Sequence, residues 1–174
     1  MRSLRAAHGT WRERRGIEPP EGEWPGARYV LVHSLAHMII NQVALECGYS
    51  AASIRERLYV RESDDPEQAM AGVLLYTAAP DSEGTLGGMV RLGKSDAFQQ
   101  ILSNALERVR LCSNDPFCAE HTAGRTEDVL HNAACHACLF TPETSCERGN
   151  RYLDRAVLTT TMAGPGMHSY FERV

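Results

Sequence analysis

The stretch Cys112–Cys146, CSNDPFCAEHTAGRTEDVLHNAACHACLFTPETSC, holds five of the chain's six cysteines. It includes the C-x-x-C motif Cys135–Cys138, and such a turn can bring two sulfur atoms to about 3.7 Å, roughly one edge of a tetrahedron with zinc–sulfur bonds of ~2.3 Å. In a reducing compartment, thiols crowded in this way are more typical of a metal site than of disulfides. The sequence therefore predicts a zinc-binding lobe over residues 112–147.

Structural zinc sites take four protein ligands, whereas this stretch offers five cysteines. We expect Cys135 and Cys138 to bind as a pair, Cys146 to return as a third ligand, and Cys112 or Cys118 to supply the fourth. The sequence leaves open which four of the five bind. Four sulfurs would leave no position for a reacting water, so a structural site is favoured over a catalytic one. Buried thiols without a metal, and an iron–sulfur cluster, are the alternatives.

The 174 residues suffice for one domain with a modest core, and an apolar fraction of 43% is typical of a folded protein. The net charge of −4 argues against a general polyanion binder. Residues 1–16, however, carry five arginines against the single acid Glu13. We interpret this segment as a solvated arm, with a nucleic-acid or partner contact as the alternative.

The residues after Met1 are charged and lack the apolar core of a signal peptide. The longest apolar run, Tyr29–Ile40, is interrupted by His33, Ser34 and His37 and is expected to be too short and too polar to span a bilayer. We therefore expect a cytoplasmic protein without a membrane contact, in which thiols stay reduced.

Apolar spacing predicts an α+β fold, with a small mixed helix and strand core carrying the cysteine-rich zinc-binding lobe. We expect a basic, then Pro/Gly-rich lead-in over residues 1–25, a domain over 26–158, and a flexible tail over 159–174. The expected helices and strands are helices near Arg28–Cys47, Ala51–Arg57, Lys94–Leu111 and Arg148–Leu158, and strands at Leu58–Arg61 and Gly72–Thr77. A Gly-rich loop, Ala79–Gly93, follows the second strand.

A second motif, His33-x-x-x-His37, places two imidazoles on one face of the first long helix. With an acid such as Glu83 they could hold a catalytic metal, which would make the chain a metal-dependent hydrolase or nuclease. The motif lacks the glutamate that follows the first histidine in metalloproteases, since Ser34 stands there. Packing within the core is the favoured interpretation of the pair. Cys47, at the end of the same helix, is expected to be an ordinary buried thiol.

Several strings together resemble a known family. HSLAHMIINQVALECGYSAASIRERLYV (33–60), GVLLYTAAPDSEGTLGGMVRLG (72–93), CSNDPFC (112–118) and HNAACHACLFTPETSCERGNRYLDR (131–155) are similar, in this order, to the C-terminal domain of the DrmB family. DrmB proteins are components of the bacterial anti-phage system DISARM. Related cysteine-rich domains end the MrfA-type repair helicases, where four cysteines hold zinc. The resemblance covers about residues 24–158, and DrmB proteins are much longer than this chain.

The resemblance implies no active site in this chain. In the family the ATPase motifs belong to other domains or to a helicase-type partner, DrmA in DISARM, and this sequence has no P-loop. We therefore expect a non-catalytic, zinc-binding accessory domain that scaffolds or helps bind DNA in a helicase complex. The alternatives are the hydrolase or nuclease using His33 and His37, and a protein–protein docking module that does not bind DNA.

Overall fold

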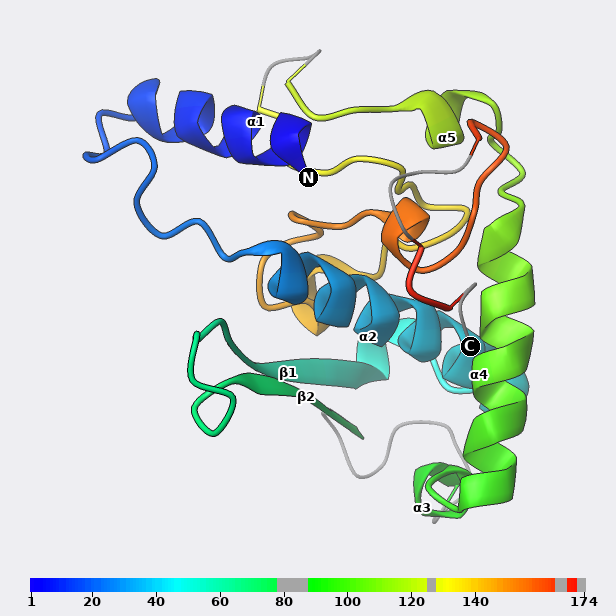
Figure 1. Cartoon of the computed structure of the whole chain (residues 1–174). Helices are drawn as coiled ribbons and strands as arrows, with labels where there is room; N and C mark the ends of the chain where they lie inside the picture. The colour runs from blue at the N-terminus through cyan, green and yellow to red at the C-terminus, as the bar shows by residue number, and fades with distance from the viewer. Residues whose placement is uncertain (78–87, 125–127, 165–168, 172–174) are drawn as a thin grey trace.

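A computed structural model, shown in Figure 1, describes residues 1–77, 88–124, 128–164 and 169–171. This part of the chain combines helices with a single two-stranded antiparallel sheet, so the predicted α+β class is confirmed. The elements with helical or extended backbone are α1 (Arg2–Glu13), α2 (Ala27–Cys47), η1 (Ala51–Ser53), β1 (Ile54–Arg61), β2 (Met70–Thr77), α3 (Gly88–Leu92), α4 (Ser95–Arg110), α5 (Phe117–Glu120), η2 (Glu143–Ser145) and η3 (Arg155–Val157).

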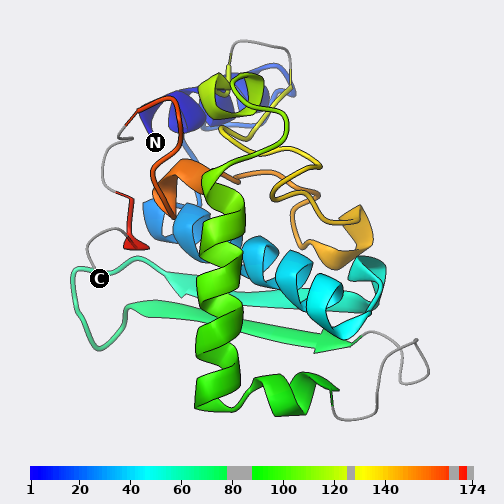
Figure 2. The ribbon, with the colours of Figure 1, turned by 90° about the vertical axis from the view of Figure 1, so that its right-hand side faces the viewer.

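Helix α2 is the central element, with the sheet, α4 and the C-terminal loops around it (Figures 1 and 2). It begins after Gly26 and ends at Gly48, whose left-handed backbone is the usual helix stop. Apolar residues occur on every side of this helix, and the buried ones include Val30, Ala36 and Ile40. Such a pattern is typical of a helix enclosed by protein.

By length and composition alone α2 is also a candidate membrane span, contrary to our expectation from the sequence, because the helix runs to 21 residues. The polar side chains of His33, Ser34 and His37 are nevertheless completely buried against other parts of the chain. A helix that buries its polar residues in protein contacts has the character of a core helix, and we interpret α2 in this way.

The sheet pairs β1 with β2 in an antiparallel register that places Leu58 opposite Val73. We predicted a short helix over Ala51–Arg57, and this is wrong after Ser53, because the strand already begins at Ile54. Side chains alternate in β1, so Ile54 and Glu56 point inward, toward α2. This early start of the strand brings an acidic side chain into the core.

Helix α4 lies across α2 and buries one apolar stripe, Ile101, Ala105 and Val109, in the main core (Figure 2). The helix was predicted at about Lys94–Leu111 and is observed at Ser95–Arg110. The C-terminal end of α4 is followed, after Leu111, by Cys112, the first of the five clustered cysteines.

The first helix was not expected. Residues 1–16 were interpreted as a solvated arm, but α1 buries Leu4 and Ala7 in a second apolar cluster with Tyr29, Leu130 and Tyr152. The ring of buried His8 also lies 2.9 Å from the hydroxyl of Tyr152. Arg2 and Arg5 lie on the exposed face of this amphipathic helix, whereas Arg12 is buried, and the composition alone did not reveal this division.

The chain after α5 is mostly irregular. The predicted helix at Arg148–Leu158 is wrong except for the single turn η3, because Asn150 and Tyr152 adopt positive φ angles that an α-helix does not allow. In the tail expected to be flexible, Thr159 and Thr161 are buried. Backbone hydrogen bonds from Tyr170 and Phe171 to the η3 region attach the later part of that tail.

Candidate metal centres

Four of the five predicted cysteine ligands come together. Cys112 follows the end of α4, Cys118 lies in α5, and Cys135 and Cys138 lie in the C-x-x-C turn. The four sulfur atoms are all within 4.8 Å of one another. The Cys112–Cys135, Cys118–Cys138 and Cys135–Cys138 sulfur pairs are separated by 3.4, 3.7 and 3.8 Å. These separations match the edges of a zinc–sulfur tetrahedron, about 3.7 Å. We call this group the four-cysteine cluster.

The local backbone explains how the sulfurs are held. In the C-x-x-C turn the carbonyl oxygen of Cys135 accepts hydrogen bonds from the amides of Cys138, Leu139 and Phe140. The amide of Asn114 points at the sulfur of Cys112, and that of Cys135 at the sulfur of Cys138, at 3.4 and 3.3 Å. Amide groups directed at sulfur stabilise thiolates, the form that binds metal.

The electrostatics of the four thiols favour a cation between them. Contact with Cys138 and the charge of Arg155 hold the pKa of Cys118 at about 6, despite burial. Burial raises the pKa of Cys112 to about 11, and the neighbouring Cys118 thiolate raises the pKa of Cys138 strongly. Of these three thiols, the protein alone thus favours the thiolate form only at Cys118, whereas a divalent cation would favour the thiolate form of its cysteine ligands.

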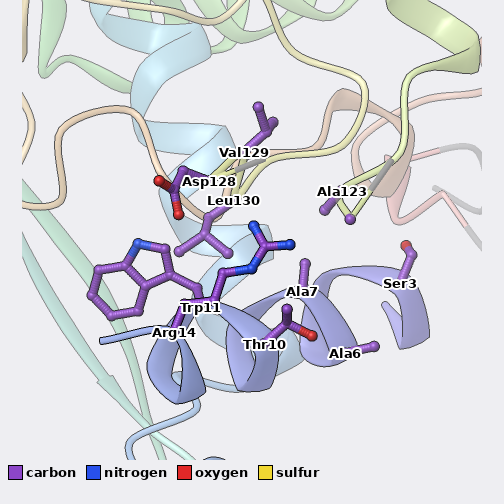
Figure 3. Close-up of a pocket in the computed structure, with 11 residues that line it drawn as sticks. Ser3, Ala6, Ala7, Thr10, Trp11, Arg14, Ala123, Asp128, Val129 and Leu130 are labelled. Carbon is purple, nitrogen blue, oxygen red and sulfur yellow. The ribbon is translucent and has the colours of Figure 1, made fainter. Parts of the chain in front are cut away.

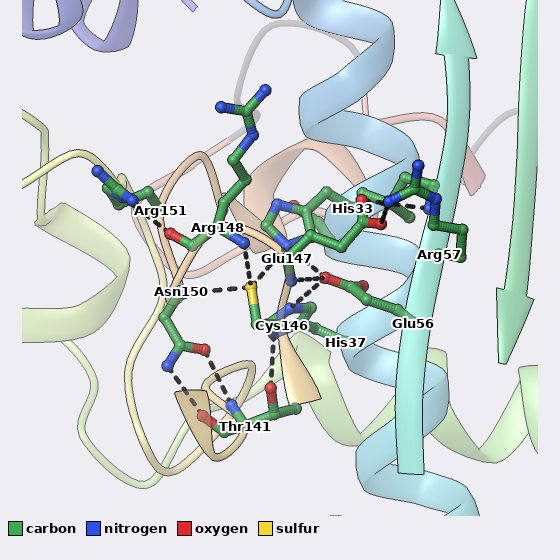
Figure 4. Close-up of polar contacts among 12 residues, drawn as sticks. His33, His37, Glu56, Arg57, Thr141, Cys146, Glu147, Arg148, Asn150 and Arg151 are labelled. Carbon is green, nitrogen blue, oxygen red and sulfur yellow. Dashed lines mark hydrogen bonds and ion pairs between the residues drawn. The ribbon is translucent and has the colours of Figure 1, made fainter. Parts of the chain in front are cut away.

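Cys146, which we expected as the third ligand of this group, lies elsewhere. It joins His33, His37 and Glu56 in a second group whose donor atoms also lie within 4.8 Å of one another (Figure 4). Nε2 of His33 is 3.2 Å from the Cys146 sulfur and 3.0 Å from Oε1 of Glu56. Nε2 of His37 is 3.4 Å from the same glutamate oxygen. We call this group the His–Glu–Cys cluster.

The His–Glu–Cys cluster is buried, and both imidazoles and the carboxylate have no exposed side-chain surface. Burial alone would raise the pKa of the Cys146 thiol, but contacts with the two histidines outweigh it and hold the pKa at about 6. Burial likewise opposes the charge on Glu56, yet His33 and His37 bring its pKa to about 2. For His37 the contacts with Cys146 and Glu56 overcome burial and raise the pKa to about 9.

The two histidines of the H-x-x-x-H motif therefore do share a site, and the acid that the described residues place beside them is Glu56. Glu83 lies outside the described residues, as does residue range 78–87 of the Gly-rich loop. Glu56 was missed, although it stands between Ile54 and Leu58 on the face of β1 that turns toward the core. Side chains alternate along a strand, so an acid two residues after the apolar Ile54 could have been recognised as facing the core. Cys47 belongs to neither cluster.

Four cavities among the described residues have no wall residue from either cluster. One cavity of about 310 Å³ lies between α1 and the segment around Leu130, lined by Thr10, Trp11, Arg14 and Asp128 among others (Figure 3). Neither cluster contributes to its wall, so the buried donor atoms are not the floor of that cavity. This arrangement suits closed, structural metal sites better than a catalytic one.

These features define a class of small domain with a cysteine-based zinc centre. The sequence matches the family model described as the MrfA Zn-binding domain over residues 35–139, and the chain belongs to that family. The matched range contains the complete four-cysteine cluster, but His33 and Cys146 fall outside it.

The chain is also 41% identical, over 155 residues, to a protein named DISARM protein DrmB from Bacillus paralicheniformis. The match covers 89% of this chain and 26% of that relative, so this chain spans about a quarter of the relative's length. The predicted resemblance to the DrmB and MrfA-type domains is confirmed.

Proposed function

We propose that this chain is a non-catalytic, zinc-stabilised accessory domain that helps a helicase-type partner hold DNA in a DISARM-type anti-phage complex. The relative's name supports the defence system, and the family supports the zinc. In this proposal Cys112, Cys118, Cys135 and Cys138 are the zinc ligands. The zinc ties the end of α4 to the C-terminal loops and gives the partner a fixed surface.

The convergence of four sulfurs on one point is the observation that carries the proposal. Without a cation, four thiols within 4.8 Å of one another would bury polar groups with poor partners. Ligands that come from three separate segments make zinc binding part of folding, because an unfolded chain does not preform the site. Zinc supplies no open position here, so its chemistry would be structural. Free thiols suit the reducing cytoplasm in which we place the protein.

A cluster of arginines supports DNA as the ligand. The guanidinium of Arg15 lies 4.5 Å from the centre of the Trp11 ring, and that of Arg151 lies 5.4 Å from it. Arg14 lines the cavity beside Trp11, and Arg151 donates a hydrogen bond to the carbonyl of Arg148. We call these five residues the Trp11 surface. Arg15 also pairs with Asp128 at 2.8 Å, and the guanidinium of Arg148 lies 5.9 Å from the centre of the Tyr29 ring. The remaining cations beside aromatic rings suit a nucleic-acid backbone better than the net charge of −4 suggests.

DNA binding by the zinc-loaded chain tests this proposal, measured by fluorescence anisotropy with labelled single-stranded and duplex DNA over a salt series. We expect binding that weakens steeply with salt, and a slope reduced by about one for each arginine lost from a phosphate contact. The double variant Arg148→Gln with Arg151→Gln should bind more weakly. Arg108→Gln, an exposed arginine on α4, is the matched control and should bind as the parent does.

Two outcomes would favour the other candidates. A chain that binds the helicase-type partner but no DNA at low salt would be a docking module. A metal-dependent DNA-cleaving activity that disappears in His33→Ala, with the fold intact, would make the chain a nuclease.

A further inference from the structure

We propose that His33, His37, Glu56 and Cys146 form a second zinc site, closed and structural, separate from the four-cysteine cluster. The inference is independent of DNA binding and of the partner. It concerns one cysteine that the first cluster does not use and two histidines that the proposed function does not need.

The donor atoms have the separations that one ion requires. Nε2 of His33, Oε1 of Glu56 and the sulfur of Cys146 face a common point, and Nε2 of His37 faces the same carboxylate oxygen (Figure 4). These three separations, 3.2, 3.0 and 3.4 Å, are near the edges of a tetrahedron around zinc, about 3.3–3.6 Å for bonds of ~2.0–2.3 Å. Imidazole nitrogen, carboxylate oxygen and thiolate sulfur are all ordinary zinc ligands.

The hydrogen bond on the far side of His37 fixes the nitrogen that would bind. Nδ1 of His37 is 2.9 Å from the carbonyl oxygen of Leu139, which can only accept, so Nδ1 carries the proton. In the neutral ring Nε2 is then a lone pair aimed at a carboxylate oxygen, and either a second proton, which the raised pKa of His37 favours, or a metal ion must lie between these two acceptors. Metal-binding histidines commonly donate their other N–H to a backbone carbonyl in this way.

Protons alone satisfy the cluster poorly. Nε2 of His33 faces both the Cys146 sulfur and Oε1 of Glu56, and a single hydrogen cannot point at both. Within the described part of the chain, Nε2 of His37, Nδ1 of His33 and Oε2 of Glu56 are buried without a hydrogen-bond partner.

The charges also favour one ion over two protons. Two imidazolium rings would balance the thiolate and the carboxylate, but the ring centroids of His33 and His37 are only 4.5 Å apart. Two buried cations at this separation repel each other, and each carries its own desolvation cost. One divalent ion supplies the same charge at a single point and bonds to all four donors.

The backbone around Cys146 prepares its sulfur as a ligand. The amides of Arg148 and Asn150 point at this sulfur at 3.3 and 3.2 Å. Positive φ angles at Gly149 and Asn150 wrap the chain around the sulfur to allow this. Amide–sulfur contacts of the same kind hold the four-cysteine cluster. In both clusters, therefore, backbone amides directed at the sulfur prepare a cysteine to bind as a thiolate.

A cysteine nucleophile is the other chemistry that a Cys–His–Glu set suggests, and the geometry opposes it. In such a triad the acid orients the histidine from the ring nitrogen remote from the thiol. Here Glu56 and Cys146 face the same nitrogen, Nε2 of His33. The imidazoles and the carboxylate also have no exposed surface, so a substrate would not reach them. Four protein ligands in a closed site indicate a structural ion.

The test begins with the unaltered chain, purified with its metal, by elemental analysis and zinc X-ray absorption. We expect about two zinc ions per chain, with an average shell of about five sulfur to three nitrogen or oxygen donors over the two sites. One zinc per chain with sulfur neighbours only would overturn the second site. It would leave the four-cysteine site, and with it the proposed function, intact.

Variants assign the second ion. Cys146→Ser and His37→Gln should each lower the zinc content from about two to about one per chain, and the remaining zinc should have four sulfur neighbours. Cys47→Ser, a cysteine outside both clusters, is the control and should keep both ions. Unchanged zinc content in folded Cys146→Ser and His37→Gln proteins would refute the assignment. If these variants fail to fold, the absorption spectrum of the unaltered chain decides.

Discussion

Nδ1 of His37 donates a 2.9 Å hydrogen bond to the carbonyl oxygen of Leu139, the residue that follows Cys138. One turn further along α2, the side-chain amide of Asn41 donates to the carbonyl of Cys138 itself at 3.1 Å. The same helix thus carries two side chains of the His–Glu–Cys cluster and fixes the C-x-x-C turn of the four-cysteine cluster. The two candidate centres are joined by direct hydrogen bonds as well as by the shared core.

Asn41→Ala tests that connection without removing a ligand. We expect the variant to keep its zinc content but to lose zinc from the four-cysteine cluster to a chelator about tenfold faster, because groups that orient ligands commonly contribute tenfold or more to affinity. Stopped-flow transfer of zinc to a coloured chelator measures this. Asn104→Ala is the control, since this exposed asparagine of α4 bonds to Glu46 instead. Equal release rates for both variants would argue against the connection.

Loss of a thiolate should be costly only where the thiol is a ligand. We expect Cys118→Ser and Cys135→Ser to lose a zinc ion and about 4 kcal/mol or more of the free energy of unfolding, because metal binding is part of folding. Cys47→Ser, at a half-buried position outside both clusters, should cost less than about 1 kcal/mol. Thermal unfolding followed with zinc analysis measures both. Similar small losses at all three positions would contradict a metal role.

The sequence predicted the regular elements where periodicity was strong. The apolar spacing of α2 and α4 located both helices to within a few residues. The N-terminal helix α1 was missed, because the five arginines of residues 1–16 and the nearby prolines outweighed a short apolar stripe that includes Leu4 and Ala7. The supposed helix at Arg148–Leu158 failed because Asn150 and Tyr152 have backbone angles that only tertiary contacts select.

The metal-binding chemistry was predicted better than its geometry. The clustered cysteines predicted a thiolate metal site, and the C-x-x-C spacing predicted that Cys135 and Cys138 bind as a pair. Nothing local could show that Cys146 turns away from that pair toward α2, because this depends on how a distant loop packs. Glu56 was hidden for a related reason. Its role appears only when β1 is known to begin at Ile54 and to face the two histidines.

The buried ion pair beside the four-cysteine cluster should be essential to stability. Arg155 is fully buried, pairs with Asp115, and donates to the carbonyls of Val109 and Arg110 at 2.8 and 3.1 Å. Asp115 in turn accepts from the amide of Cys112. Arg155→Met leaves the carboxylate buried without its cation, so we expect a loss of about 3–5 kcal/mol in the free energy of unfolding.

Urea unfolding of the zinc-loaded protein checks this expectation. Arg57→Met is the matched control, because Arg57 pairs with Glu147 at 2.8 Å but is well exposed, and such pairs contribute about 0–1 kcal/mol. The double variant Arg155→Met with Asp115→Asn should recover part of the loss, since no charge is then left unpaired. If Arg155→Met and Arg57→Met cost the same, the buried pair does not support the cluster.

The stability of the protein should be as sensitive to substitution at the start of α2 as to substitution of the buried histidines on this helix. Gly26 has φ 89° and ψ 165°, a backbone region that essentially only glycine adopts, whereas Gly48 at the other end has φ 68° and ψ 16°. A β-carbon at Gly26 would also lie 2.3 Å from the carboxylate of Glu62, which accepts a hydrogen bond from the amide of Arg28. At Gly48 nothing lies within 4 Å of such an atom.

We therefore expect Gly26→Ala to cost about 2–3 kcal/mol and Gly48→Ala about 1–2 kcal/mol in the free energy of unfolding. Because α2 carries His33 and His37, a displaced helix start should also speed zinc release from the His–Glu–Cys cluster. Urea unfolding together with zinc release to a chelator measures both effects. Zinc release that is faster in Gly48→Ala than in Gly26→Ala would show that the C-terminal end of α2, and not its start, positions the two histidines.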